Sequence, residues 1–443
     1  MNIRAALTAS LLACGLAHAS AGGDALIRAI RNDDPAGVRA ALAAHADPND
    51  RLPDGSTPLA WAVESQDAQI INLLLDHGAA ANGARDGSPS PLFLACESGD
   101  ARTIGLLLDA HADAKVSQAD GITSFAVCAG TAFPPSLERM LARGAEVDRP
   151  DAAGQTPLMR AAANGRLDNM KLLLTHGAQP NRRTDKGFTP LFFALRSAEP
   201  HAADMLLDAG ADPDYVAPDG TSVVQMAMYQ GKYAFAARLI DRGANLTALD
   251  RNGNQLLHAA VLASQPALVR QLLVKGADAN ALPGESKVKW RFEVNFKSAP
   301  YNVPHKSPLL LAAGLGSAEI MRMLVNAGAD ANFRATDGTN VALASIASGK
   351  ADALAFALQL QPDANATTAD GQTALHLLLS GVSDADGVDE QTTAMMKLLA
   401  DHGARVDIKN KEGQTAVDIA EDEQSNTRVA FEAVFGKPKV SRL

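Results

Sequence analysis

The chain repeats itself every 33 residues, and this period limits its fold more than any other feature. A Thr-Pro-Leu step or a degenerate equivalent opens each copy, and a Leu-Leu-x-x-Gly-Ala step closes it. A strict period of this length is typical of a solenoid of stacked helical pairs. With the proline as the reference, the slot falls at Pro58, Pro91, Ser124, Pro157, Pro190, Val223, Leu256, Pro308, Val341, Ala374 and Ala416, after a cruder first copy near Ala25.

The copy from Asp151 to Asn181 shows the pattern most clearly. Thr156 is a good helix cap, and Pro157 suits the first helical turn because its missing N–H has no partner there anyway. We therefore expect the first helix to begin at Pro157 and to end where Asn164-Gly165 reverses the chain. Its stack-facing residues at helical spacing are Leu158, Ala161 and Ala162.

A second helix follows in the same copy, with its apolar stripe at Leu167, Met170, Leu173 and Leu174. Gly177 should end this helix, since glycine accepts the left-handed backbone conformation of a helix terminus. Other residues occupy the closing glycine slot in three copies, at His45, His111 and Gln361. We expect backbone strain at these three positions.

Together these slots resemble the ankyrin repeat. The matching segments include Asp54-Gly55-Ser56-Thr57-Pro58-Leu59, Gly187-Phe188-Thr189-Pro190-Leu191, Gly371-Gln372-Thr373-Ala374-Leu375-His376 and Gly276-Ala277-Asp278-Ala279-Asn280. The resemblance covers about residues 23 to 436. It implies an all-α ankyrin-repeat solenoid of about twelve helix-pair units, each with a β-turn finger. The units start near 23, 54, 87, 120, 153, 186, 219, 252, 304, 337, 370 and 412, within an array over 20–436 and before a tail over 437–443.

Composition narrows the range of ligands. The formal charge is −10 and no basic stripe runs along any expected helix, so nucleic acid is not an expected partner. Most histidines fall at repeat slots, such as His258 and His376 after the Pro-Leu step, and are expected to be structural. No metalloprotease, hydrolase or phosphate-loop motif occurs, so we expect no cofactor, no metal and no enzymatic activity.

The first nineteen residues have the features of a secretory signal. Arg4 precedes an apolar stretch from Ala5 to Leu16, and Ala17-His18-Ala19 supplies the small residues of a cleavage site. The mature chain would then begin at Ser20 and reach the periplasm. The alternative is that Leu11-Leu12-Ala13-Cys14 is a lipoprotein box with a lipid anchor at Cys14, which would make an outer-membrane lipoprotein. No other stretch has the ~20 apolar residues that a membrane span needs.

Two more cysteines, Cys96 and Cys128, lie on the first helices of adjacent copies, where other copies carry alanine. Equivalent positions on packed helices lie about 8–10 Å apart, farther than the ~7 Å that a disulfide allows between Cα atoms. We therefore predict two buried cysteines in alanine positions, with a disulfide as the alternative.

Two insertions break the period, which is where solenoids often place special function. The longer one, 282–304, contains an alternation of Val288, Trp290, Phe292, Val294 and Phe296 with polar residues, followed by Tyr301. Period two predicts a half-buried strand in an extended β finger, which either packs on neighbouring fingers or offers an edge to a partner. The shorter one, 382–390, is acidic. We expect a solvated loop there, with a partial calcium loop as the alternative.

The resemblance implies that partner-facing residues lie at the finger tips and at the ends of the first helices. Exposed aromatic and arginine side chains are the usual anchors of protein interfaces. The predicted anchors are Phe188, Arg196, Tyr229, Gln230 and Leu262, together with Trp290, Phe292 and Tyr301 of the insertion.

These features predict a periplasmic protein-binding scaffold or inhibitor that acts as a monomer on one other protein, still to be identified. Three alternatives stay open from the sequence. The chain could be an immunity-type protein that neutralises a toxin, a structural envelope protein anchored by lipid, or an enzyme that uses the acidic insertion with a metal.

Overall fold

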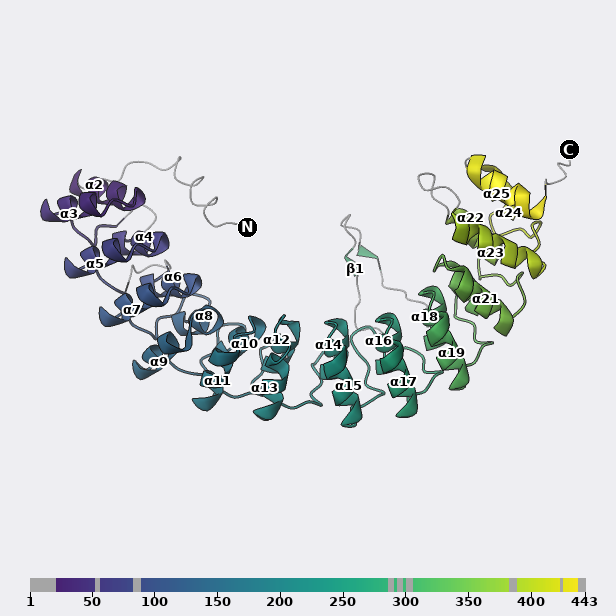
Figure 1. The fold of residues 1–443 in the computed structure, drawn as a ribbon, viewed down its shortest axis with the longest axis horizontal. Coiled ribbons are helices and arrows are strands. Elements are labelled where there is room, and N and C mark those ends of the chain that lie inside the picture. Colours follow the sequence, from purple (N-terminus) through teal and green to yellow (C-terminus); the bar gives the residue numbers. More distant parts are fainter. Residues whose placement is uncertain are drawn as a thin grey trace. The chain divides into compact units, whose positions relative to one another are not determined.

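The computed structural model describes residues 21–51, 56–82, 89–285, 291–292, 298–299, 306–381, 389–422 and 425–436, and within them consecutive helices form helix–turn–helix pairs (Figure 1). The first helices of the pairs are α2 (Ala21–Arg31), α4 (Pro58–Ser65), α6 (Pro91–Ser98), α8 (Ser124–Thr131), α10 (Pro157–Ala163), α12 (Pro190–Arg196), α14 (Val223–Tyr229), α16 (Leu256–Leu262), α18 (Pro308–Gly314), α20 (Val341–Ile346), α22 (Ala374–Ser380) and α24 (Ala416–Asp422). The second helices are α3 (Pro35–Ala43), α5 (Ala68–Asp76), α7 (Ala101–Asp109), α9 (Pro134–Ala142), α11 (Leu167–Thr175), α13 (Ala202–Asp208), α15 (Tyr233–Asp241), α17 (Pro266–Val274), α19 (Ala318–Asn326), α21 (Ala351–Leu360), α23 (Glu390–Asp401) and α25 (Ser425–Phe435).

The helices group into two compact bodies, an N-terminal body over Met1–Asp212 and a C-terminal body over Pro213–Leu443. In both, a first helix packs on the second helix of its own pair and on the first helix of the next pair. Within the C-terminal body the first helices lie along one side and the second helices along the other (Figure 1). This is the stacking that the period predicts.

Helix caps explain where the first helices begin. The Thr156 hydroxyl accepts a hydrogen bond from the Met159 N–H at 3.3 Å, and Pro157 occupies the first turn of α10. The predicted start is confirmed, and Thr57, Ser90 and Ser307 cap their helices in the same way. Each cap satisfies a backbone N–H that has no partner inside the helix.

The position that closes each second helix is left-handed in most repeats, whether or not it holds glycine. Gly177 has φ 90°, and His45 and His111 are held at φ 64° and 62°. A side chain in this region costs roughly 1 kcal/mol or more, as expected for both histidines. The prediction is wrong for Gln361, whose φ is −137°. Its backbone is extended, and its side-chain amide donates to the Asn332 side chain at 3.0 Å.

The core runs through the middle of each helix pair. Leu158, Ala161 and Ala162 of α10 are fully buried, as predicted. In α11, Met170 and Leu173 are buried, whereas Leu167 and Leu174 are only half-buried. Small alanines on the first helices let neighbouring pairs approach closely, so most of the apolar area is buried between repeats rather than inside one.

Cys96 on α6 and Cys128 on α8 form a disulfide, so the prediction of two free cysteines is wrong. Their Cα atoms lie 4.6 Å apart. The sequence estimate used the spacing of equivalent positions, but Cys96 lies five residues after its reference slot and Cys128 only four. This offset of one residue turns the two side chains toward each other, and both are fully buried.

A ladder of asparagine side chains joins successive repeats at the loops that follow the second helices. In each rung the side-chain amide donates to a glycine carbonyl in the next loop, and its oxygen accepts the N–H two residues further on. The full rungs are Asn49 with Gly78 and Ala80, Asn181 with Gly210 and Asp212, Asn280 with Gly328 and Asp330, and Asn365 with Gly403 and Arg405.

The ladder shows that the insertions do not disturb the stack. Ordinary rungs span 29 and 31 residues, whereas the Asn280 rung spans 48 and 50. The Asn365 rung spans 38 and 40. The geometry of each rung stays the same, so the extra residues leave the array without changing how α17 and α19, or α21 and α23, pack on each other.

The described part of the longer insertion is a pair of two-residue strands. Strand β1 (Arg291–Phe292) pairs antiparallel with β2 (Ser298–Ala299), so that Arg291 faces Ala299 and Phe292 faces Ser298. The strand lies on the side of the C-terminal body that carries the first helices (Figure 1). The rest of the predicted β finger lies outside the described residues, as do the predicted signal over 1–19, residues 382–388 of the acidic insertion and the tail over 437–443.

We predict that the double variant Cys96→Ala/Cys128→Ala lowers the free energy of unfolding by about 2–4 kcal/mol, because the cross-link constrains the unfolded chain. The measurement is denaturant unfolding followed by circular dichroism, with and without dithiothreitol. The reductant should destabilise the wild type and leave the double variant unchanged. Alkylation of Cys96 and Cys128 in the unreduced, unfolded protein would contradict the disulfide.

We also predict that Asn280→Ala lowers the free energy of unfolding of the C-terminal body by about 1–3 kcal/mol, since it removes both hydrogen bonds of one rung. Asn326→Ala, at the exposed end of α19, is the matched control and should have little effect. Hydrogen exchange would place the loss at the loops after α17 and α19. An equal effect of the two substitutions would show that the Asn280 rung does not contribute to the free energy of unfolding.

Candidate functional site

Exposed apolar side chains concentrate in one stretch of the C-terminal body. Among the described residues, the large hydrophobic side chains that are exposed are Phe133, Val216, Tyr229, Leu249, Leu262, Val274, Leu282, Leu315 and Val429. All except Phe133 and Val429 lie between positions 216 and 315. This stretch holds the five helices α14 to α18, on both sides of the longer insertion.

Three of these residues form a row on successive fingers. Val216, Leu249 and Leu282 are 42%, 39% and 45% exposed, and each lies six residues after the glycine that closes a second helix. Because neighbouring fingers lie side by side, residues at this spacing line up along the stack. The corresponding positions of other repeats are not large aliphatic residues: Arg51, Ala84, Ser117, Pro150, Arg183, Arg334, Thr367 and Lys409. We call Val216, Leu249 and Leu282 the finger row.

Two predicted anchors, Tyr229 and Leu262, are exposed at the ends of α14 and α16. Tyr229 is 41% exposed and Leu262 is 42% exposed. The Tyr229 hydroxyl donates a hydrogen bond to the carboxylate of Asp250, which directly follows Leu249 in the next finger. This bond holds the ring of Tyr229 against the finger while its outer part stays in solvent. Gln230, also predicted, is exposed at the end of α14.

The Asp250 carboxylate is buried and is a fixed part of the finger. It also accepts hydrogen bonds from the backbone N–H groups of Asn252 and Asn254, each at 2.8 Å. Burial and the hydrogen bond to Asp250 raise the pKa of Tyr229, so its hydroxyl stays protonated and remains a donor. The aromatic side chain of Tyr229 is therefore held in one orientation by the chain itself, before any other protein binds.

The other predicted anchors belong to the N-terminal body or to the longer insertion. Phe188 and Arg196 belong to the N-terminal body. Phe188 is half-buried and packs on Phe192, with ring centroids 5.5 Å apart, whereas Arg196 is exposed at the end of α12. Trp290 and Tyr301 lie outside the described residues, and only the backbone of Phe292 is described, in β1.

The sequence analysis missed the finger row itself. Its signal was present, because a large aliphatic residue recurs at positions 216, 249 and 282 with the period of the array. The resemblance points to finger tips and first-helix ends, and this slot is neither of them. Leu315, at the C-cap of α18, is a further exposed leucine, located after the insertion in the chain.

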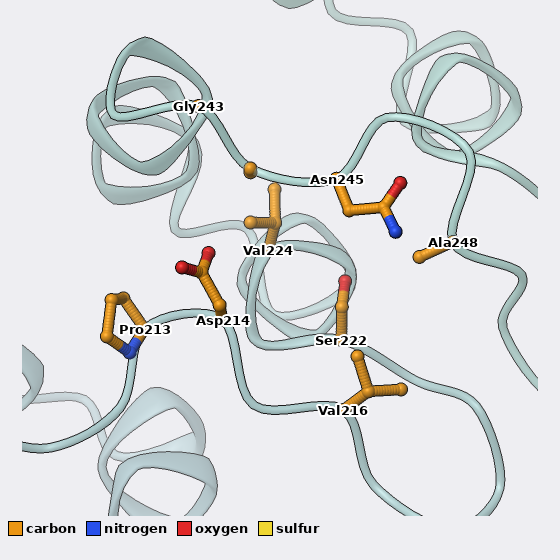
Figure 2. A pocket seen from close by; sticks show the side chains of 9 residues that line it. Pro213, Asp214, Val216, Ser222, Val224, Gly243, Asn245 and Ala248 are labelled. Atoms are coloured by element: carbon orange, nitrogen blue, oxygen red, sulfur yellow. The ribbon is translucent and has the colours of Figure 1, made fainter.

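A small pocket opens beside Val216. It has a volume of about 230 Å³ and is lined by Pro213, Asp214, Val216, Ser222, Val224, Gly243, Ala244, Asn245 and Ala248 (Figure 2). Its walls come from the finger before α14 and the loop after α15. All lining residues belong to the C-terminal body.

The buried histidines His258 and His376 differ in the hydrogen bonds that they make. His376 takes part in the cap of α22 through Thr373, and its Nε2 lies 3.1 Å from the Gln414 carbonyl of the following repeat. His258 is equally buried, but neither ring nitrogen makes a hydrogen bond of normal geometry. Burial lowers its pKa to about 4, and the Ala281 backbone and the Asp250 charge oppose this only in part.

The described residues contain no group of three or more histidine, cysteine, aspartate or glutamate side chains placed to hold a metal ion. Over the same part of the chain, no helix is both long and apolar enough to cross a membrane.

Comparison with known families agrees with the repeat geometry. The family description "Ankyrin repeats (3 copies)" matches residues 26–120, 124–217 and 202–282, and "Ankyrin repeat" matches 305–336. These matches span more than half of the chain, which therefore belongs to the ankyrin-repeat family. Its members generally mediate protein–protein interaction and are typically scaffolds without enzymatic activity. A comparison with curated proteins finds no match.

We predict that His258 makes stability depend on pH. Its pKa is lower in the folded protein than the ordinary value near 6.5, so the unfolded chain binds the proton first as the pH falls. Stability is complete above about pH 6.5 and declines toward pH 4. Between pH 7.5 and pH 5 the loss should be on the order of 2 kcal/mol.

The measurement compares denaturant unfolding at the two pH values for the wild type and for His258→Gln. The variant should lose less stability on acidification than the wild type does. His77→Gln, which removes an exposed histidine, is the control and should keep the full dependence. An unchanged pH dependence in His258→Gln would show that this histidine is not responsible.

Proposed function

We propose that this protein binds one other protein through the finger row and the neighbouring helix ends, and that it acts as a scaffold or inhibitor in the periplasm. The binding surface consists of Val216, Leu249 and Leu282 with Tyr229, Leu262 and Leu315. The partner would present an apolar surface of matching length. The predicted aromatic residues of the insertion, Trp290, Phe292 and Tyr301, would extend this contact.

The observation that carries the proposal is the row of exposed aliphatic residues on three successive fingers. Single exposed hydrophobic residues are ordinary on protein surfaces, but a contiguous group is typical of an interaction site. Solubility alone would favour polar residues at this slot, as at Arg183, Arg334 and Lys409. A row that is aliphatic only beside the insertion is best explained by a partner that covers it.

Preorganisation supports the same surface. Tyr229 is fixed on Asp250, and the fingers around it are joined by backbone hydrogen bonds such as that from Gly284 N–H to the Gly253 carbonyl at 2.8 Å. A rigid aromatic side chain loses little conformational freedom when a partner covers it. This favours Tyr229 as an anchor of the interface.

The disulfide supports the proposed compartment. Disulfides persist in secreted and periplasmic proteins and are rare in the reducing cytosol. The Cys96–Cys128 bond is therefore what we expect of an exported chain, in line with the secretory signal predicted over residues 1–19.

The proposal is tested by site-specific cross-linking in intact cells. A photoreactive residue at Leu249 should give one adduct of discrete mass, recovered in the periplasmic fluid released by osmotic shock. Tyr229→Ala in the same chain should weaken the purified complex by about 1–3 kcal/mol, the usual effect of losing an interface anchor. The exposed Val274, at the end of second helix α17, is the matched control position.

Adducts at Val274 as abundant as those at Leu249 would show that the finger row is not a preferred surface. Equal affinity of the Tyr229→Ala variant would remove this residue from the interface. Recovery of the chain and its adduct only in the cytosol would contradict the proposed compartment.

A further inference from the structure

His258 lies in a position of the repeat where polar side chains of other repeats have two partners. The equivalent residues, two places after the proline reference, include Gln225 and His376. Each of these binds the capping side chain of its own helix and a backbone carbonyl of the next finger. A polar group in this position is therefore satisfied only when both the cap and the next finger supply a partner.

His258 has neither of these partners. Gln255 takes the N-cap position of α16 without a side-chain cap hydrogen bond, and the longer insertion interrupts the next finger. The His258 side chain is fully buried, and neither ring nitrogen makes a hydrogen bond of normal geometry within the described residues. The buried Leu310 and Leu343 hold the same position in the next two repeats, so the stack itself needs no polar group there.

Two groups near the ring connect His258 with the finger row. The Ala281 backbone and the Asp250 carboxylate both favour the protonated form of the ring, so they lie close to it. Asp250 directly follows Leu249, and Ala281 directly precedes Leu282. A change at His258 therefore reaches two of the three fingers in the row.

The surroundings of His258 offer little to stabilise a positive charge. The titratable side chains on the helices and fingers that pack most closely against α16 are Tyr229 of α14, Arg270 of α17, and Asp250, Arg251 and Glu285 of the two fingers, and α18 carries none. Arg251, Arg270 and Glu285 are exposed. Asp250 is buried, but it already accepts hydrogen bonds from Tyr229 and from two backbone N–H groups. Protonated His258 would therefore have to compete for a carboxylate that the finger already uses.

We propose that His258 is an acid sensor of the finger row: its neutral ring keeps the fingers of Leu249 and Leu282 on α16, and its protonation releases them together with a bound partner. This inference rests on the proposed function, because the finger row is the surface that His258 controls. A buried imidazolium without a partner is costly, so the proton is taken up mainly in an open form in which the ring reaches water.

The direction and size of the response follow from the pKa of His258. Burial lowers this pKa to about 4 in the closed form, whereas the open form keeps the ordinary value near 6.5. The closed form is therefore fully favoured above about pH 6.5 and loses this advantage as the pH falls toward 4. At pH 5 the equilibrium constant for opening should be about 30-fold larger than at pH 7.5.

Hydrogen exchange of the full-length protein at pH 7.5 and pH 5, corrected for the intrinsic exchange rates, measures this opening. In the wild type the protection of α16 and of residues 249–254 and 281–284 should fall about 30-fold at pH 5. His258→Leu should keep its protection, since leucine holds this position in the next two repeats. His376→Leu makes the same change at the histidine that has partners and should leave the response intact.

His258→Gln is the second variant if leucine prevents folding, because Gln225 shows that glutamine fits this position. An unchanged response in the folded His258 variants would overturn the sensor. An equal loss of protection over all helices of the C-terminal body would also overturn it, since the opening would then not be confined to the two fingers and α16.

Cross-linking at Leu249 separates the sensor from the proposed function. In released periplasmic fluid the wild-type adduct should be less abundant at pH 5 than at pH 7.5, and the adduct of His258→Leu should be equally abundant at both. Equal wild-type adducts at the two pH values would keep the proposed function and overturn the control by His258. No adduct at either pH, with an opening that still depends on His258, would remove the proposed interface and with it the release of a partner.

Discussion

Contact between neighbouring repeats is the constraint on which this structure depends. A pair of helices of six to twelve residues cannot cover its own apolar face, so each pair is stable only against the next one. Fully buried residues such as Leu158, Ala161 and Ala162 therefore serve the interface between pairs. The same constraint fixes the backbone at every repeat, which leaves only the finger, the first-helix end and the outer loop free to vary.

That freedom explains how two insertions are accommodated. The Asn280 and Asn365 rungs keep the geometry of the ordinary rungs although many more residues separate their partners. These hydrogen bonds from side chain to backbone depend on the positions of the two loops, and the number of residues between the loops does not affect them. An array of this type can therefore gain a β hairpin next to its exposed apolar row without loss of packing.

Much of the fold could be predicted from the sequence, because its signals are local and repeated. Thr156 and Pro157 mark a helix start, and Gly177 a helix end, by backbone rules that hold in any context. The Cys96–Cys128 bond was not predictable in this way, since it depends on how two helices are rotated against each other. Gln361 has an extended backbone and not a left-handed one. Its side chain is hydrogen-bonded to Asn332 and Asn340, which belong to other segments of the chain.

The candidate site was predicted only in part for a related reason. Tyr229, Gln230 and Leu262 are exposed as expected, while Phe188 is partly used for packing on Phe192. Whether an aromatic side chain serves a partner or the stack depends on its neighbours, which a slot in a repeat does not specify. The 33-residue spacing of the finger row is visible in the sequence. Only the folded structure shows that Leu249 is exposed while many other leucines are buried.

The ladder also shows what distinguishes asparagine from aspartate at a rung. Asparagine both donates and accepts, as Asn181 does with the Gly210 carbonyl and the Asp212 N–H. Aspartate in the same slot has only acceptors, so the Asp148 carboxylate accepts the Gln179 N–H at 2.9 Å and cannot donate to a carbonyl. Because each rung joins only adjacent loops, a rung without the donor leaves the complete rungs at Asn181 and Asn280 unchanged.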